Sequence, residues 1–119
     1  MPTLTASALN SAAEAIKDDM ASGTLEIGTA GMAAVLVTFP LNATAGVVAA
    51  NVITLNGFPQ TVAAAGAGTA AEARIRDSVS GDVVTGLTVG TGGTDVILDN
   101  TNIAAAQDVT IDSGTITIS

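Results

Sequence analysis

The sequence predicts a mainly β protein, with a β-sandwich or jelly-roll-like antiparallel body and one N-terminal α-helix. Helical spacing of apolar residues is confined to the first 22 residues. After Gly23 the chain changes to short runs of β-forming residues separated by Gly, Asn, Asp and Ser. The length of 119 residues fits one domain. We therefore expect an N-terminal helical arm over residues 1–22 and a β-sandwich body over residues 23–119.

The arm is predicted to be a helix because its apolar residues recur at the spacing of one helical face. This stripe consists of Leu9, Ala12, Ala13, Ile16 and Met20. Thr3 or Thr5 could cap the helix, or a capping box of Ser11 and Glu14 could start it later. Gly23 is predicted to close the helix in a left-handed conformation. Since the stripe is thin, we expect it to dock on its own β body or on a neighbouring subunit.

In the first part of the body, strands are predicted over residues 24–27, 33–39 and 46–55. Asn56-Gly57 then gives a strong signal for a type I′ hairpin turn, in which both residues have positive φ. Pro59 weakens the strand that would follow, because proline removes a ladder donor. Residues 63–71 are nearly all Ala and Gly, which fits either a weak strand or a loose connection.

The second part alternates more regularly. Over residues 71–77 the pattern predicts Ala71, Ala73 and Ile75 on a buried face, with Glu72, Arg74 and Arg76 on the solvent face. Further strands are predicted over residues 83–89, 95–98 and 108–119. In the last of these the inward residues are predicted to be Val109, Ile111, Ile116 and Ile118, and Gly114 is predicted to mark a bulge. Seven or eight short strands at this spacing indicate a sandwich or jelly roll.

Charge excludes several partners. Three basic residues stand against eleven acidic ones, giving a net charge of -8. Nucleic-acid backbones and anionic membranes are both bound by clustered Lys and Arg, so we expect neither as a partner. The chain has no cysteine, so it has no disulfides or thiolate ligands.

The residue inventory also argues against catalysis. The chain has no His, Cys, Tyr or Trp, so it lacks the usual proton shuttle and the usual zinc ligands. A pair of carboxylates could in principle hydrolyse glycosides. A sugar site also needs stacking aromatics, and only Phe39 and Phe58 are present. We expect no enzyme and no cofactor.

Two acidic patterns raise the question of calcium. Residues 90–98 resemble one copy of a glycine-rich calcium nonapeptide, but such sites form between stacked repeats, so an ordinary Gly-rich turn is favoured. Asp95, Asp99, Asp108 and Asp112 could meet at one end of the sandwich and bind a hard cation. Aspartates that stabilise turns are the favoured interpretation, and no metal site is predicted.

The candidate interface consists of the helical stripe together with Arg74 and Arg76. Hydrophobic residues make up 48% of the chain, more than one small core needs, which favours burial in an assembly. The arginines could pair with carboxylates across the strand, which is the favoured interpretation, or anchor a neighbouring subunit.

The second half resembles a family of small bacteriophage virion proteins encoded among head and tail genes. The resemblance is carried by residues 73–78, Gly81, residues 86–91 and 95–99, then 109–111 and 115–118; the N-terminal helix leading into residues 22–27 also fits. It implies a structural role in the virion, most simply as a capsid decoration (cement) protein on the outside of the shell. The implied partners are the major capsid protein and further copies of this chain. The resemblance also leaves open a tail or head–tail connector component, and a carbohydrate-binding or adhesin module is the alternative of a different class.

Overall fold

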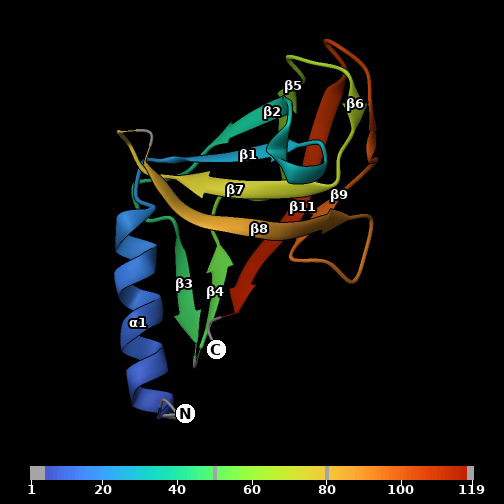
Figure 1. Ribbon diagram of the computed structural model, residues 1–119. Helices are drawn as coiled ribbons and strands as arrows, with labels where there is room; N and C mark the ends of the chain where they lie inside the picture. The colour runs from blue at the N-terminus through green and yellow to red at the C-terminus, as the bar shows by residue number, and fades with distance from the viewer. Residues whose placement is uncertain (1–4, 50, 80, 118–119) are drawn as a thin grey trace.

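The computed structural model describes residues 5–49, 51–79 and 81–117. It is mainly β, with one N-terminal helix and a curled, largely antiparallel sheet that forms a sandwich-like body (Figure 1). The predicted fold class is therefore confirmed.

The described residues form one α-helix, one short 3-10 turn and eleven strands. They are α1 (Ala6–Asp19), β1 (Thr24–Gly28), η1 (Ala30–Met32), β2 (Val35–Pro40), β3 (Gly46–Ala49), β4 (Val52–Leu55), β5 (Gln60–Ala63), β6 (Gly68–Thr69), β7 (Glu72–Arg76), β8 (Asp82–Gly90), β9 (Val96–Leu98), β10 (Asn102–Ile103) and β11 (Asp108–Thr117).

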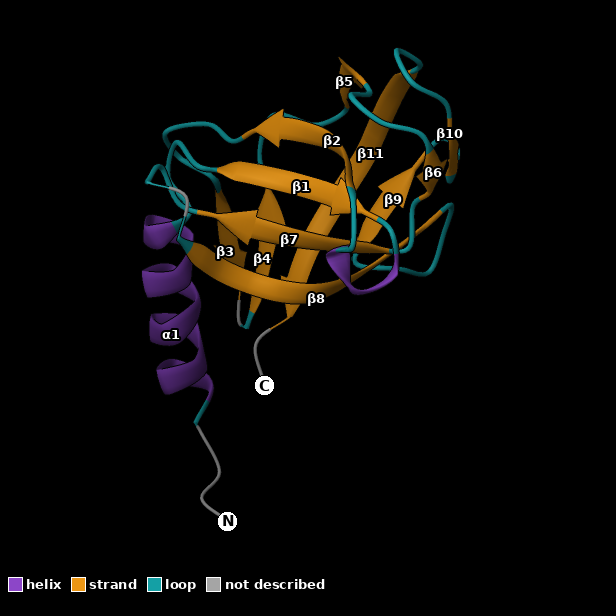
Figure 2. Cartoon of the chain, turned by 45° about the horizontal axis from the view of Figure 1, so that its top comes forward, coloured by secondary structure: helices purple, strands orange, loops and turns teal. Residues whose placement is uncertain are grey.

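The main sheet has the order β2-β1-β7-β8-β9-β11-β4-β3, and β5 pairs with another part of β11. All pairs are antiparallel except β8 and β9, which run parallel. The sheet curls so that β2, β1, β7 and β8 form one layer, here called the front layer, while β9, β11, β4 and β3 lie behind it as the back layer (Figure 2). The strands β6 and β10 form a separate two-stranded ladder.

The core fills the space between the two layers. On the front layer the inward residues of the central strands, Leu25, Ile27, Ala73 and Ile75, are fully buried. The back layer contributes Ile53, Val96, Leu98, Val109, Ile111 and Ile116. Alternation along each strand places these side chains on one face, and their burial removes apolar area from water at about 25 cal/mol per Å².

The helix begins where Thr5 caps it. The Thr5 hydroxyl accepts a hydrogen bond from the Ala8 amide at 3.2 Å, so the predicted Thr5 cap is confirmed and the later start at Ser11 is wrong. The prediction for Gly23 is also wrong, because Ser22 takes the left-handed conformation, with φ 57°. Gly23 is required for a different reason: a Cβ there would lie 2.0 Å from the Arg76 carbonyl oxygen. The residue that follows the helical arm, Gly23, therefore lies in close contact with the backbone of β7.

The segment predicted as one strand over residues 46–55 is two strands. β3 and β4 form an antiparallel hairpin with pairs running from Gly46–Leu55 to Ala49–Val52, so the chain reverses between Ala49 and Val52. The sequence does place a turn-forming residue, Asn51, between the two strands, but the Val-rich residues on both sides of it have the same β propensity, so the run was predicted as one strand.

The predicted type I′ hairpin at Asn56-Gly57 is wrong. Gly57 has the expected positive φ, 88°, but Asn56 does not, and a type I′ turn needs both. The flanking strands β4 and β5 do not pair with each other. Each pairs with a different part of β11, so the residues between them carry the chain along that strand instead of reversing it.

Two further predictions, for Ala71 and Gly114, need adjustment, and the connection predicted as one alternative for residues 63–71 is confirmed. Ala71 is exposed and Ala70 is buried, because β7 begins only at Glu72. Residues 63–71 are mostly a connection, with the two residues of β6 inside it. The bulge in the last strand falls between Ile111 and Ser113, and Gly114 is instead a point of close approach, where a Cβ would lie 2.8 Å from Leu55 Cδ1.

In that last strand Val109, Ile111 and Ile116 are buried as predicted. Ile118, the fourth predicted inward residue, lies outside the described residues.

We predict that Gly23→Ala lowers the free energy of unfolding by about 2–3 kcal/mol, because the added Cβ overlaps a backbone carbonyl that cannot move aside. The matched control is Gly92→Ala, where a Cβ would meet nothing within 4 Å. Urea titration of both variants measures the difference. Equal midpoints for the two variants would contradict the close contact between Gly23 and β7.

Candidate functional site

The two arginines of the predicted interface lie in an ion-pair cluster on the outer side of the front layer. Arg74 stands directly opposite Glu26 of β1, and its Nε lies 2.5 Å from Glu26 Oε1. This hydrogen bond raises the pKa of the Arg74 guanidinium. Arg74 therefore pairs with a carboxylate across the strands of the same chain, as the favoured interpretation of the sequence predicts.

Arg76 completes the cluster. Its Nη1 lies 4.0 Å from Glu26 Oε1, and its Nε lies 3.1 Å from Asp82 Oδ1 on β8. The Nε makes no hydrogen bond, so the contact with Asp82 is an ion pair only. Two carboxylates therefore balance two guanidinium groups. Although 24% of the Arg74 side chain and 29% of the Arg76 side chain are exposed, the cluster offers no net positive charge to an anion.

The helical stripe packs on its own β body. α1 lies beside β3 and β4 (Figure 1). Ala13 and Met20 are fully buried in the core of the chain itself, and Ile16 packs against that core. Of the predicted interface residues on the helix, Leu9 and Ala12 keep part of their surface exposed. Contact of the arm with another molecule stays a prediction, and Met20 and Ala13 have no free surface for it.

The solvent side of the helix carries its charges. Lys17 Nζ lies 2.9 Å from Glu14 Oε2 and 3.7 Å from Asp18 Oδ1. The hydrogen bond with Glu14 raises the pKa of Lys17. This is the local pairing expected of charges one helical turn apart, and it positions no group for chemistry.

The aspartates of the Gly-rich turns bind the backbone. Asp95 Oδ2 accepts hydrogen bonds from both the amide and the hydroxyl of Thr88, each at 3.1 Å, which closes the turn over residues 90–94. Asp99 Oδ1 accepts from the Thr110 amide at 3.2 Å. Among the described residues no group of three or more acidic side chains is placed to hold a metal ion. The Asp95 contacts close a turn, as the favoured interpretation expects, whereas the Asp99 contact joins the end of β9 to β11.

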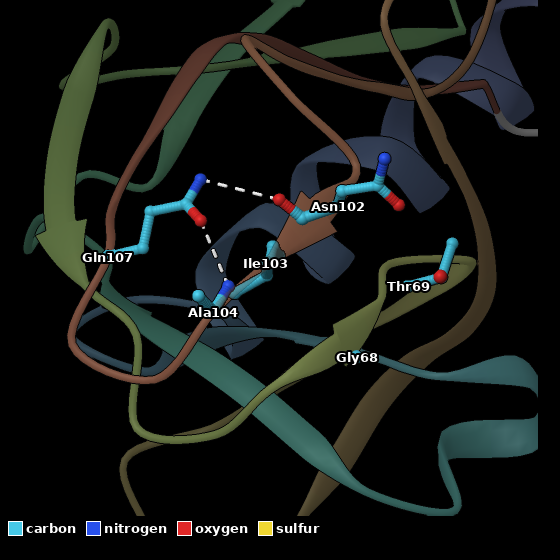
Figure 3. Close-up of a pocket in the computed structure, with 6 residues that line it drawn as sticks. All are labelled: Gly68, Thr69, Asn102, Ile103, Ala104 and Gln107. Carbon is cyan, nitrogen blue, oxygen red and sulfur yellow. Dashed lines mark hydrogen bonds between the residues drawn. The ribbon is translucent and has the colours of Figure 1, made fainter.

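A shallow depression of about 390 Å³ lies beside the β6–β10 ladder (Figure 3). Its lining consists of Gly68, Thr69, Asn102, Ile103, Ala104 and Gln107. The Gln107 amide is already used, because its Oε1 accepts from the Ala104 amide at 2.9 Å and its Nε2 donates to the Asn102 carbonyl at 3.4 Å. The depression contains no charged group, and the amide of Gln107 already forms hydrogen bonds with the backbone around the turn that follows β10.

The two aromatic residues belong to the core. Phe39 is fully buried, and half-buried Phe58 packs edge-on against it, with ring centroids 6.5 Å apart. A sugar platform presents an open ring face to its ligand, so this placement does not favour a carbohydrate-binding module.

Compared with models of protein families, with curated proteins and with solved structures, the chain matches none. Within the described residues, no helix combines the length and apolar character needed to span a membrane.

One surface feature was not predicted from the sequence. Val47 on β3 is 59% exposed and is one of two large hydrophobic side chains that lie open to solvent in the described residues. The other, Val79, stands at the tip of the β7–β8 loop. Because residues 46–55 were predicted as one strand, the pairing that sets which face Val47 occupies could not be inferred. The register of the β3–β4 hairpin supplies that information.

We predict that Glu26→Gln lowers the urea midpoint of unfolding, because this carboxylate lies within ion-pair distance of both arginines and only 14% of its side chain is exposed. Glu72→Gln is the control, since Glu72 shares the outward side of β7 but makes none of these ion pairs. The effect should be larger at low salt, where screening is weaker. An equal midpoint for both variants would refute the structural role of the cluster.

We also predict that the melting temperature in millimolar calcium equals that in a chelator to within about 1 °C, because a ligand stabilises a protein only by binding its folded state. Differential scanning calorimetry measures this. A rise of several degrees that disappears in Asp95→Asn or Asp99→Asn would show a calcium site in these turns.

Proposed function

We propose that this chain is a bacteriophage virion structural protein, and specifically a capsid decoration protein that binds the outer shell and stabilises it against the pressure of packaged DNA. Its partners are then the major capsid protein and further copies of itself. The role is structural and involves no catalysis.

The observation that carries the proposal is where the phage-like segments lie. In the second half of the chain, the residues that resemble small virion proteins fall on β7, β8, β9 and β11 and the turns between them, and these four strands are consecutive neighbours in the sheet. Residues 22–27, which also fit, lead into β1, the neighbour of β7. The resemblance therefore follows a connected half of the fold, including the layer-to-layer crossing at β8 and β9. Scattered β-rich matches would not be expected to form one continuous unit.

Charge supports an external position. A chain with a net charge of -8 is repelled by packaged DNA, whose phosphates bind proteins through Lys and Arg. Two of its three basic residues, Arg74 and Arg76, are already balanced by Glu26 and Asp82. The outer surface of a shell places the protein away from this repulsion and leaves the acidic turns in water.

The composition of the core is consistent with a protein that gains stability by binding to neighbouring molecules. Five of its buried side chains are alanines, which bury little area each: Ala13, Ala45, Ala64, Ala70 and Ala73. Binding to a partner that recognises only the folded state adds stability by mass action. A shell with many identical sites is such a partner.

The test is the copy number in purified particles of the phage whose genome encodes the chain. Quantitative mass spectrometry should find hundreds of copies, comparable in number to the major capsid protein, and particles that lack the protein should lose DNA at a lower temperature. A few to dozens of copies would instead indicate a tail or connector component. Absence from the particles would overturn the virion role.

A further inference from the structure

The dipeptide Asn56-Gly57 begins the connection from β4 to β5, and water can reach it. Gly57 is exposed and Asn56 is half-buried. Gly57 lies outside the strands, and within the described part of the chain its backbone amide donates no hydrogen bond. Because glycine has no Cβ, no side chain shields this nitrogen from the Asn56 side chain.

The fold requires both residues of this dipeptide. Gly57 has φ 88°, and a Cβ there would lie 3.0 Å from Asn42 Nδ2, so any other residue would be strained. Asn56 closes the open end of the β3–β4 hairpin. Its backbone amide donates to the Ala45 carbonyl at 2.9 Å, and its side-chain Nδ2 donates to the Thr44 carbonyl at 3.3 Å. The structure therefore keeps an amide side chain directly before a glycine.

We propose that Asn56 is a site of spontaneous deamidation. The Gly57 amide nitrogen, once it has lost its proton, attacks Asn56 Cγ and forms a succinimide ring. The side-chain amino group takes up a proton and leaves as ammonia. Water then opens the ring at either carbonyl, which gives aspartate or isoaspartate. The net reaction consumes one water and releases one ammonia, so it needs no enzyme and no redox partner.

The other asparagines are less suited to this reaction, because each precedes a residue whose Cβ shields the amide nitrogen. They are Asn10, Asn42, Asn51, Asn100 and Asn102. Asn10 and Asn102 also lie within α1 and β10, where hydrogen bonds hold the backbone. The Asn100 side chain is held in place, since its Oδ1 accepts from the Asn102 amide at 3.0 Å. Asn42, which is exposed, is the nearest competitor.

Deamidation removes a contact on which the hairpin depends. A carboxylate accepts hydrogen bonds but has no N–H to donate, so the bond to the Thr44 carbonyl is lost and two acceptor oxygens face each other. Isoaspartate also brings the side-chain methylene into the backbone between β4 and β5, which pair with different parts of β11. The converted chain carries one more negative charge than the original -8, and we expect it to be less stable.

The first test follows each asparagine in the folded full chain, kept in mildly alkaline buffer. Mass spectrometry of pepsin fragments should show Asn56 converting at least about tenfold faster than Asn42 or Asn100, because only Asn56 precedes a residue without a Cβ. An isoaspartate methyltransferase should label the fragment that contains residue 56. Asn56→Gln should abolish this first conversion, because the longer side chain closes its ring more slowly. The matched control, Asn100→Gln, should leave it unchanged.

Two results would overturn the proposal. One is an Asn56 that converts in urea but stays intact in the folded chain, since the fold would then protect it. The other is an Asn56 that converts no faster than Asn42. The reaction involves this chain alone, so neither result bears on the decoration role.

A second measurement tests the structural consequence. Ion-exchange chromatography separates the converted chain by its added negative charge. Its urea midpoint of unfolding should lie below that of the unconverted chain. Freshly purified Asn56→Asp should show part of this loss, because it also lacks the Nδ2 donor to Thr44. Equal midpoints for the three proteins would show that the hairpin does not depend on this amide.

Discussion

The back layer is organised by one long strand, β11, and by the bulge inside it. β11 pairs in turn with β5, β9 and β4 as it runs from Asp108 to Thr117. Before the bulge the buried positions are Val109 and Ile111, and after it they are Gly114 and Ile116. Simple alternation from Ile111 would turn Ser113 inward and Ile116 outward. The extra residue between Ile111 and Ser113 restores the phase, so that both halves of the strand face the same core.

Gly114 follows from the same constraint. Once the bulge has turned this position inward, its Cβ would occupy the space of the Leu55 side chain from β4. The pairing of β4 with the end of β11 therefore requires both the bulge and the absence of a side chain at Gly114. The outward side of the back layer depends on this arrangement, because the register of Thr115 and Thr117 with β4 sets which residues point outward.

Local patterns in the sequence predicted the elements that are decided locally. The alternation from Ala73 to Arg76 gave β7 its inner and outer faces, and the Thr5 cap and the helical spacing gave α1. The failures occurred where distant residues decide the outcome. The role of Gly23 depends on the Arg76 carbonyl, more than 50 positions along the chain. The hairpin predicted at Asn56-Gly57 is absent because β5 pairs with β11 and not with β4. For the candidate interface, the sequence predicted the ion pairing of Arg74. It could not show that Ala13 and Met20 are fully buried in the chain's own core.

Many acidic residues of this chain form hydrogen bonds or ion pairs within it. Two of them stabilise turns: Asp77 Oδ1 accepts from the Val79 and Gly81 amides, and Asp95 Oδ2 accepts from Thr88. Asp99, at the end of β9, accepts from the Thr110 amide of β11. Others lie on α1 or in the ion-pair cluster. Much of the negative charge therefore lies at turns, on the helix and on the front layer, while Asp108 and Asp112 lie on β11 of the back layer.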